Sequence, residues 1–157
     1  MIHLISRTLI ERSVEQVFDF VSTPENDFQW QYGTLASARI SEGTSQRGTS
    51  FRSIGHLLGH RVQGTFEVTI YEPNRKYGFK SLSGPWQSHT SYTFEVNNGS
   101  TQIDISTQVT MINFHQVSQG ELEKDMKKQL KENLAMLKDL LEAGQVLPAP
   151  ETNALVR

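Results

Sequence analysis

The stretch SVEQVFDFVSTPENDFQW, residues 13–30, predicts a short amphipathic helix that begins at a serine and stops at a proline. Ser13 suits the N-cap position, and Gln16, three residues later, completes the pattern of a capping box, in which each side chain bonds the other residue's backbone N–H. Apolar residues then recur at helical spacing on one face, at Val14, Val17, Phe18 and Val21. Pro24 closes the helix, which is therefore short.

The same stretch predicts a second helical turn over Pro24–Gln31, because proline is well suited to the first turn of a helix. Phe28 and Trp30 stand near the end of this turn. Two readings are open for these aromatic residues: they fill a small core, or they cover an opening in the structure. The elements around the stretch decide between them.

Strands are predicted on both sides of the two helices. Aliphatic and β-branched residues alternate with polar ones from Ile2 to Glu11, which indicates a strand before the first helix. After the second helix, short alternating segments are separated by turn signals such as Glu42-Gly43, Pro73-Asn74 and Asn97-Asn98-Gly99, a pattern typical of an antiparallel sheet. Six strands are expected there: Leu35–Ser41, Thr49–Leu58, Arg61–Glu72, Tyr77–Ser83, Trp86–Val96 and Thr101–Met111.

A long amphipathic helix is predicted over Gln119–Ala143, where lysine and glutamate occupy the face opposite an apolar stripe. The stripe consists of Leu122, Met126, Leu130, Leu134, Leu137 and Leu141. Gly144 is expected to end this helix. Residues 145–157 include two prolines and few residues suited to a core, so we expect a flexible C-terminal tail.

Length and composition favour a single domain, expected over residues 1–144. A chain of 157 residues buries roughly 68–70% of the surface of its unfolded form, which leaves room for a core with a cavity. The 17 acidic and 15 basic residues give a net charge of −2 without a basic run, so no nucleic-acid partner is expected. Cysteine is absent and the five histidines lack zinc-site spacing, so we expect no metal and no cofactor.

The N-terminal segment MIHLISRTLIERS carries charges within its first residues and lacks the apolar core of a secretory signal. No segment approaches the roughly 18 apolar residues of a membrane-spanning helix. We therefore expect a cytoplasmic protein without a membrane span, and the sequence leaves its oligomeric state open.

The order of one strand, two short helices, six antiparallel strands and one long C-terminal helix resembles the START-like superfamily, also called SRPBCC or helix-grip. Within it, the chain looks like the polyketide cyclase/dehydrase-type branch. The similar segments are SVEQVFDFVSTPENDFQW, QRGTSF, FEVTIYEPNRKYGF, NNGSTQIDIS and the final LKDLLEA. The resemblance implies an α+β helix-grip fold, in which a curved seven-stranded antiparallel sheet (β-α-α-β6-α) wraps around the C-terminal helix and leaves an internal cavity for an apolar or amphipathic ligand. In such a fold Phe28 and Trp30 would belong to a lid.

Alternation along the strands predicts which side chains face that cavity. In the strand Arg61–Glu72 the inward set is Val62, Gly64, Phe66, Val68 and Ile70, and in the last strand it is Ile103, Ile105, Thr107, Val109 and Met111. The two strands between them point inward with Tyr77, Phe79, Ser81, Ser83, Trp86, Ser88, Thr90, Tyr92, Phe94 and Val96. The candidate ligand-binding residues are Trp30, Phe66, Tyr77, Phe79, Ser81, Trp86, Ser88, Thr90, Tyr92, Thr107 and Met126.

The inward hydroxyl groups support a cavity, because a buried hydroxyl without a partner costs about 1–3 kcal/mol. A ligand or water in a cavity would complete their hydrogen bonds. Alternatively, these hydroxyls bond neighbouring backbone or lie at the solvent end of the sheet. Gln129 and Asn133 flank the stripe of the long helix and could also reach a ligand, although the polarity of a helix surface explains them equally well.

No catalytic residue can be assigned from the sequence. Tyr77 and Tyr92 are the best titratable candidates on inward positions, whereas His89 and Asp104 have outward parity. Three classes of function stay open: binding of a hydrophobic or amphipathic small molecule such as a lipid, polyketide-like or aromatic compound; a cyclase, aromatase or dehydratase-type enzyme; and a protein-interaction module. The outward strand residues are largely polar, which disfavours the third class.

Overall fold

The structure, a computed structural model, describes residues 1–110 and 114–149. Its elements follow the expected order: β1 (Ile2–Ile10), α1 (Val14–Val21), the 3₁₀ helix η1 (Pro24–Gln29), β2 (Thr34–Arg39), β3 (Ser50–Leu57), β4 (His60–Glu72), β5 (Lys76–Ser83), β6 (Gln87–Asn97), β7 (Ser100–Thr110) and α2 (Gln119–Ala143). Met111 and residues 150–157 lie outside the described residues.

Local capping fixes the start of α1 as predicted. The Ser13 Oγ accepts a hydrogen bond from the Gln16 backbone N at 3.3 Å, and the Ser13 backbone N donates to the Gln16 Oε1 at 3.4 Å. The helix then buries one face toward the sheet, and its buried residues are Val14, Val17, Phe18, Phe20 and Val21. Pro24 opens η1, so the expected second helical turn is confirmed as a 3₁₀ helix.

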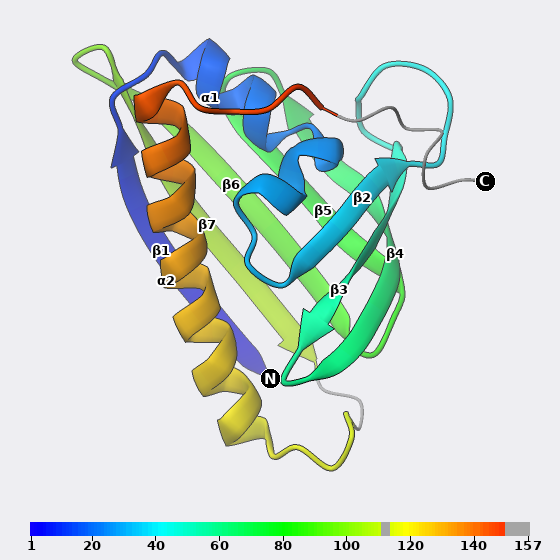
Figure 1. The fold of residues 1–157 in the computed structure, drawn as a ribbon. Coiled ribbons are helices and arrows are strands. Elements are labelled where there is room, and N and C mark those ends of the chain that lie inside the picture. Colours follow the sequence, from blue (N-terminus) through cyan, green and yellow to red (C-terminus); the bar gives the residue numbers. More distant parts are fainter. Residues whose placement is uncertain (111–113, 150–157) are drawn as a thin grey trace.

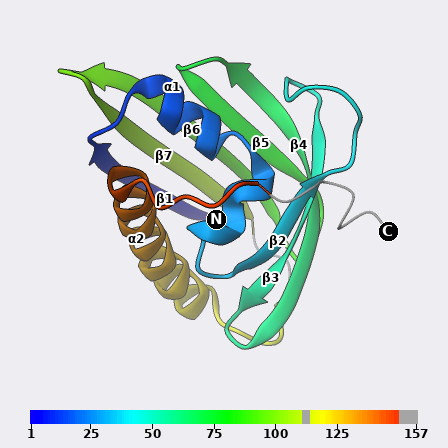
Figure 2. The ribbon, with the colours of Figure 1, turned by 45° about the horizontal axis from the view of Figure 1, so that its top comes forward.

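Seven antiparallel strands form one sheet in the order β1-β7-β6-β5-β4-β3-β2. The sheet is strongly curved, so that β1 runs directly behind α2 whereas β2, β3 and β4 lie apart from it, to the right in the view (Figure 1). In the turned view, α1 and η1 lie over the concave side at one end of the sheet (Figure 2). The α+β helix-grip fold with a curved seven-stranded sheet and a C-terminal helix is therefore confirmed.

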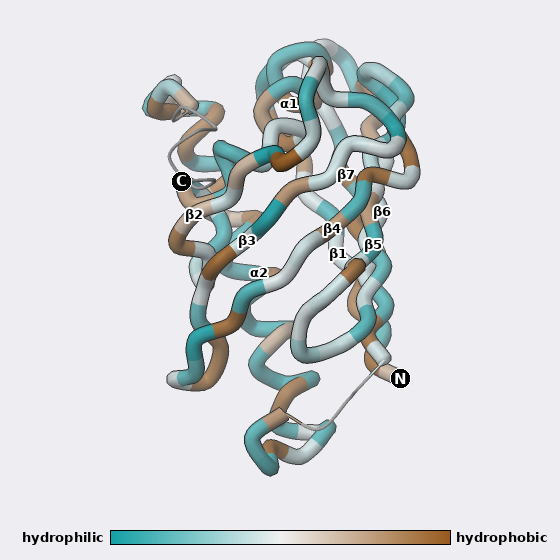
Figure 3. Tube along the Cα trace, turned by 90° about the vertical axis from the view of Figure 1, so that its right-hand side faces the viewer, coloured by the Kyte–Doolittle hydropathy of each residue, from teal (hydrophilic) through white to brown (hydrophobic). Residues whose placement is uncertain are grey.

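The core consists of two clusters on the concave side. The larger one joins α1, Trp30, the C-terminal half of α2 and the middle of the sheet, and includes Tyr92, Phe94 and Leu137. The smaller one lies at the other end of the sheet around Ile2, Phe114 and Leu122. Leu130 packs against both clusters. Hydrophobic and hydrophilic residues are interspersed along the strands, as expected for a sheet with one buried face (Figure 3).

Alternation holds along β7, where Ile103, Ile105 and Val109 are buried, but it breaks in β4. A register shift between Val68 and Ile70 pairs Tyr71 with Tyr77 and Ile70 with Gly78. The Tyr71 ring lies 5.4 Å from Phe18, so Tyr71 faces the core. The prediction that Ile70 points inward is therefore wrong, because a β-bulge exchanges the two faces of the strand.

A second exception to the alternation is Val96, which was expected to face inward. Val96 is 68% exposed, because it stands near the end of β6, beyond the last core residue of that strand. Ser83, at the end of β5, is exposed as well. Alternation along a strand thus predicts which face of the sheet a side chain is on. The curvature of the sheet decides over what length of each strand that face is covered.

The long helix buries Leu122, Leu134, Leu137 and Leu141 against the sheet. Gly144 ends it in the left-handed conformation with a φ of 67°. Beyond the helix, the Leu147 backbone N donates to the Gln29 Oε1 at 2.7 Å, and the Gln29 Nε2 donates to the Leu147 O at 3.0 Å. The first residues of the tail are therefore attached to η1.

Candidate functional site

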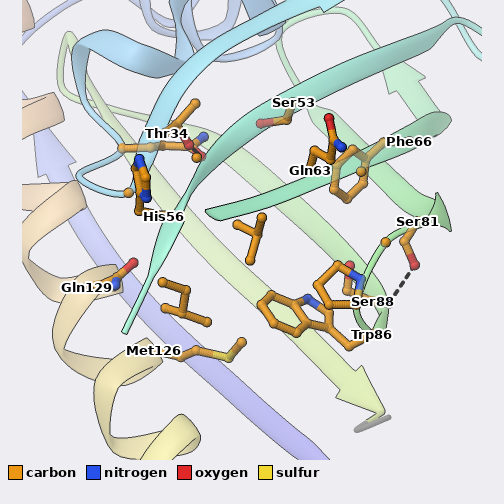
Figure 4. A pocket seen from close by; sticks show the side chains of 18 of the residues that line it. Thr34, Ser53, His56, Gln63, Phe66, Ser81, Trp86, Ser88, Met126 and Gln129 are labelled. Atoms are coloured by element: carbon orange, nitrogen blue, oxygen red, sulfur yellow. Dashed lines mark hydrogen bonds between the residues drawn. The ribbon is translucent and has the colours of Figure 1, made fainter. Parts of the chain in front are cut away.

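Two adjoining cavities lie between α2 and the sheet. One, of about 200 Å³, is bordered by β3, β4 and the β5–β6 connection, and we name it the β3–β4 cavity (Figure 4). The other, of about 230 Å³, is bordered by β6 and β7, and we name it the β6–β7 cavity. The two share lining residues, among them Phe66, Trp86, Ser88 and Met126, so they adjoin one another on the concave side, and we call the two together the hollow.

Ten of the eleven predicted ligand-binding residues line at least one cavity. Phe66, Trp86, Ser88 and Met126 line both, Ser81 lines the β3–β4 cavity, and Trp30, Phe79, Thr90, Tyr92 and Thr107 line the β6–β7 cavity. Tyr77 lines neither. Its side chain is 2% exposed and packs in the core, with ring centroids 5.8 Å from Tyr92 and 6.3 Å from Tyr71.

Most of the predicted hydroxyls have protein partners. The Ser81 Oγ accepts a hydrogen bond from the Ser88 backbone N at 2.8 Å, and the Thr90 and Thr107 hydroxyls lie 3.1 Å apart. These groups therefore follow the alternative in which neighbouring protein atoms complete the hydrogen bonds. Their side chains still form part of the wall, and the pairing lets them border an apolar hollow at little cost.

Aromatic rings form most of the apolar wall. Phe66 and Phe79 meet at a centroid distance of 5.7 Å in a T-shaped contact, and Phe51 stacks on Phe66 at 5.2 Å. At the end of the sheet Trp86 packs edge-to-face on Phe114 at 5.2 Å. Such contacts hold the rings in place around the hollow.

Two histidine rings contact the ring of Phe114 at this end of the molecule. The rings of His60, in β4, and His115 stack with centroids 3.7 Å apart and an interplanar angle of 3°. This pair could not be detected from the sequence, because the two residues are 55 positions apart and no local pattern relates them.

Trp30 is placed by η1. Its backbone N donates to the Asp27 O at 3.2 Å, and its side chain is 3% exposed and borders the β6–β7 cavity. The indole Nε1 is buried and has no hydrogen-bond partner among the described residues. Phe28 is half-buried and lines neither cavity. Of the two aromatics of η1, only Trp30 therefore contributes to the cavity wall.

Buried carboxyl groups hold η1 against its surroundings. Glu25 is 2% exposed, and its Oε2 accepts hydrogen bonds from the Arg39 backbone N at 2.8 Å and the Arg39 Nε at 3.4 Å. Burial, together with the nearby charge of Glu25, raises the pKa of Asp27 well above its ordinary value. Both causes favour the neutral form of the Asp27 carboxyl.

Tyr92 is the tyrosine of the cavity wall, and it is held in its neutral form. Burial raises the pKa of the Tyr92 hydroxyl, and the neighbouring Asp27 adds to this effect. The group can therefore donate a hydrogen bond but does not act as a base near neutral pH. His56, of β3, is the other titratable side chain among the described residues that line the two cavities.

Three amide side chains border both cavities: Gln31, which follows η1, and Gln129 and Asn133 of α2. Gln129 and Asn133 could be identified as candidates from the sequence, because they lie at the edge of the apolar stripe of α2. No sequence pattern indicated that Gln31 would border the cavities. The backbones of Gly33 and Gly55 approach closely here, since a Cβ on Gly55 would lie 2.1 Å from the Gly33 O. Only glycine permits this approach of the start of β2 to β3. The start of β2 is linked to α2 by the hydrogen bond from the Tyr32 backbone N to the Asn133 Oδ1.

The comparison with protein families agrees with this geometry. The family model described as polyketide cyclase / dehydrase and lipid transport matches residues 1–142. The chain belongs to this family. No curated protein matches it in sequence.

Solved structures of START-like proteins share its fold. A protein of Thermus thermophilus superposes with a TM-score of 0.76 at 15% identity, over 91% of this chain and 99% of the other. A START superfamily protein from Mycobacterium smegmatis gives a TM-score of 0.71 at 16% identity, over 92% and 97%. The di-domain ARO/CYC StfQ from the steffimycin biosynthetic pathway gives 0.69 at 13% identity, over 90% of this chain and 45% of that chain.

Family and fold together imply a role in hydrophobic ligand binding or of the polyketide cyclase type. Among the described residues, no helix combines the length and the apolar character that crossing a membrane requires. The question that follows is what the two cavities hold.

Proposed function

We propose that this START-like protein binds a hydrophobic or amphipathic small molecule, such as a lipid, polyketide-like or aromatic compound, between the sheet and α2. The observation that carries the proposal is the pair of adjoining cavities between the sheet and α2. The binding unit is residues 1–144, and the ligand-binding residues are the ten predicted ones that border the hollow. Tyr77 contributes by packing behind the wall residue Tyr92.

The wall chemistry favours such a ligand. Phe66, Phe79 and Trp86 present ring surface to the hollow, and Met126 adds a flexible apolar side chain from α2. Burying apolar ligand surface against them gains roughly 25 cal/mol per Å². Pockets for small ligands typically measure roughly 300–1,000 Å³, and the two adjoining cavities of about 200 and 230 Å³ approach that range together.

A cyclase, aromatase or dehydratase-type reaction is the second candidate. Tyr92 favours it, because this residue borders the β6–β7 cavity and its neutral hydroxyl is able to donate a hydrogen bond. The fold shared with the ARO/CYC StfQ is consistent with this candidate. Pocket shape would then fold a reactive chain, and Tyr92 would assist proton transfer.

Ligand binding is tested by native mass spectrometry of the protein purified from its own host, followed by fluorescence titration. A retained mass adduct identifies the class of ligand. Both tryptophans, Trp30 and Trp86, border the β6–β7 cavity, so a bound ligand should change their emission in a saturable way. The single-tryptophan variants Trp30→Phe and Trp86→Phe should each retain part of that change.

A panel of fatty, aromatic and polyketide-like compounds that leaves the emission of both variants unchanged, together with a protein free of adducts, would contradict the binding proposal. The wall aromatics would then be ordinary core residues.

A further inference from the structure

The amides at the junction of the two cavities carry unused hydrogen-bonding groups of known polarity. Asn133 accepts a hydrogen bond at its Oδ1 from the Tyr32 backbone N at 2.7 Å. Gln129 donates from its Nε2 to the Asp125 Oδ2 at 2.9 Å. A backbone N–H only donates and an ionised carboxylate only accepts, so both amide orientations are determined by their partners.

What remains free follows from these bonds. Within the part of the chain that the structure describes, the Asn133 Nδ2 is left as a donor and the Gln129 Oε1 as an acceptor, each without a hydrogen-bond partner. The Gln129 Oε1 lies 3.3 Å from the position that a Cβ on Gly33 would occupy, so it reaches across to the start of β2. The two residues are four positions apart on α2, which places them one above the other on the same helix face. Both border both cavities (Gln129 is labelled in Figure 4).

The described lining of both cavities lacks side chains with a full charge. Among the described residues that line the two cavities, none is a lysine, arginine, aspartate or glutamate. Lys127 and Lys131 border a separate groove between α2 and β1. An anionic ligand in the hollow would therefore lose its hydration without gaining a lysine or arginine partner, and the Asp125 carboxylate next to Gln129 would repel it.

We infer that the ligand is an uncharged amphipathic molecule whose carbonyl or hydroxyl oxygen sits at the cavity junction, where Asn133 Nδ2 donates to that oxygen and Gln129 Oε1 accepts from a ligand hydroxyl. This inference rests on the proposed binding function and narrows it. Under this inference, neutral ketones, phenols and alcohols bind in the hollow. Fatty acids and other carboxylates bind poorly, although they offer a similar apolar surface.

Four naphthalene compounds test the inference, because they share one ring system and differ in the attached group: naphthalene, 2-acetonaphthone, 2-naphthol and 2-naphthoate. Binding is measured by calorimetry and by ligand-detected NMR at pH 7.5. The ketone and the naphthol should bind at least tenfold more tightly than the naphthoate, and several-fold more tightly than naphthalene.

Two variants separate the two hydrogen bonds. Asn133→Asp keeps an acceptor for the Tyr32 N–H but removes the donor, so the affinity for 2-acetonaphthone should fall about tenfold while 2-naphthol keeps its partner at Gln129. Gln129→Met removes the acceptor, so the affinity for 2-naphthol should fall while that for the ketone changes less than about threefold. Glu132→Gln, at an exposed position on the same helix, is the control and should change neither. A merely structural loss would lower the affinity for all four compounds together.

Three outcomes overturn the inference. Binding of 2-naphthoate as tight as that of the neutral compounds would remove the charge argument, and equal effects of each variant on ketone and naphthol would remove the assigned hydrogen bonds; in both cases the binding function would stand. If none of the four compounds binds and a broader apolar panel also fails, the binding function falls and the inference falls with it.

Discussion

The Tyr92 hydroxyl distinguishes a binding protein from an enzyme. Tyr92→Phe removes one oxygen and leaves the ring, which packs between Tyr77 and Phe94 in the core. For a binding protein, affinity for a ligand should change no more than the roughly tenfold that a single hydrogen bond of about 1 kcal/mol allows. For an enzyme in which Tyr92 transfers a proton, turnover should fall by roughly 10²–10⁴-fold.

Both quantities are measured on the same preparation, binding by fluorescence titration and turnover with a polyketide-like substrate. Unchanged turnover in Tyr92→Phe would rule out Tyr92 as the proton donor. Phe79→Leu is a useful comparison, because it removes ring surface from the same cavity without removing a polar group.

Asp27 predicts a pH dependence of stability. Its pKa is raised in the folded protein above the ordinary value of 3.8, so the folded state keeps a proton that the unfolded state releases. The stability that this proton provides is present below about pH 4 and is lost as the pH rises toward the folded-state pKa. Asp27→Asn does not titrate, so its stability relative to the wild type should increase from about pH 4 upward, until the pH passes the folded-state pKa of Asp27.

Urea denaturation at intermediate pH values measures this difference. Asp139→Asn, at an exposed position on α2, serves as the control and should run parallel to the wild type. If the stability of Asp27→Asn also ran parallel to that of the wild type over this pH range, the raised pKa of Asp27 would be contradicted. The pH at which the gain in Asp27→Asn levels off marks the folded-state pKa of Asp27.

Among the elements, α2 has two functions along its length. Leu137 is fully buried in the larger core cluster, so Leu137→Ala should lower the free energy of unfolding by about 2–5 kcal/mol. Leu130 is half-buried and borders the β6–β7 cavity. Leu130→Ala should therefore cost less stability and should admit larger ligands, because it extends an existing hollow.

Chemical denaturation gives both stability values, and titration with ligands of increasing size gives the second effect. A near-neutral Leu137→Ala would contradict the packing of α2 on the sheet. Equal losses at the two positions would mean that Leu130 is a core residue rather than part of the cavity wall.

For the whole molecule, the hollow couples ligand binding to folding. It exists only when the curved sheet, η1 and α2 are assembled, so a ligand binds the folded state alone. At a free ligand concentration of about 100 times its Kd, the stability should rise by about 2.7 kcal/mol. For a chain of this size that corresponds to roughly 5–10 °C in Tm.

Thermal unfolding followed by circular dichroism, at several concentrations of the compound found by mass spectrometry, measures the effect. The rise in Tm should continue with the logarithm of the ligand concentration. A Tm that does not depend on ligand concentration would show that the compound binds outside the folded hollow or not at all.

The sequence by itself determined the elements and their order, because the signals for them are local. A capping box at Ser13, the proline at Pro24 and the leucine stripe ending at Gly144 each act within a few residues, and the structure confirms all three. Alternation also gave most of the inward side chains correctly, since the pleat of a strand has a period of two. The family resemblance then supplied the curvature, which no single strand encodes.

Only the tertiary structure decided which of these side chains meet. The bulge between Val68 and Ile70 depends on pairing with β5, and it turns Tyr71 inward. Tyr77 points to the inner face as predicted, yet it lies in the core. The space over this part of the sheet is filled by packed side chains, among them Phe18 and Tyr92. Gln31, Gln129 and Asn133 border the same two cavities, and the hydrogen bond from the Tyr32 backbone N to the Asn133 Oδ1 joins their two segments. Local sequence pattern determines which face of its strand or helix each residue occupies. A cavity, by contrast, is defined by distances between residues far apart in the chain. Those distances arise only when the sheet closes around the helix.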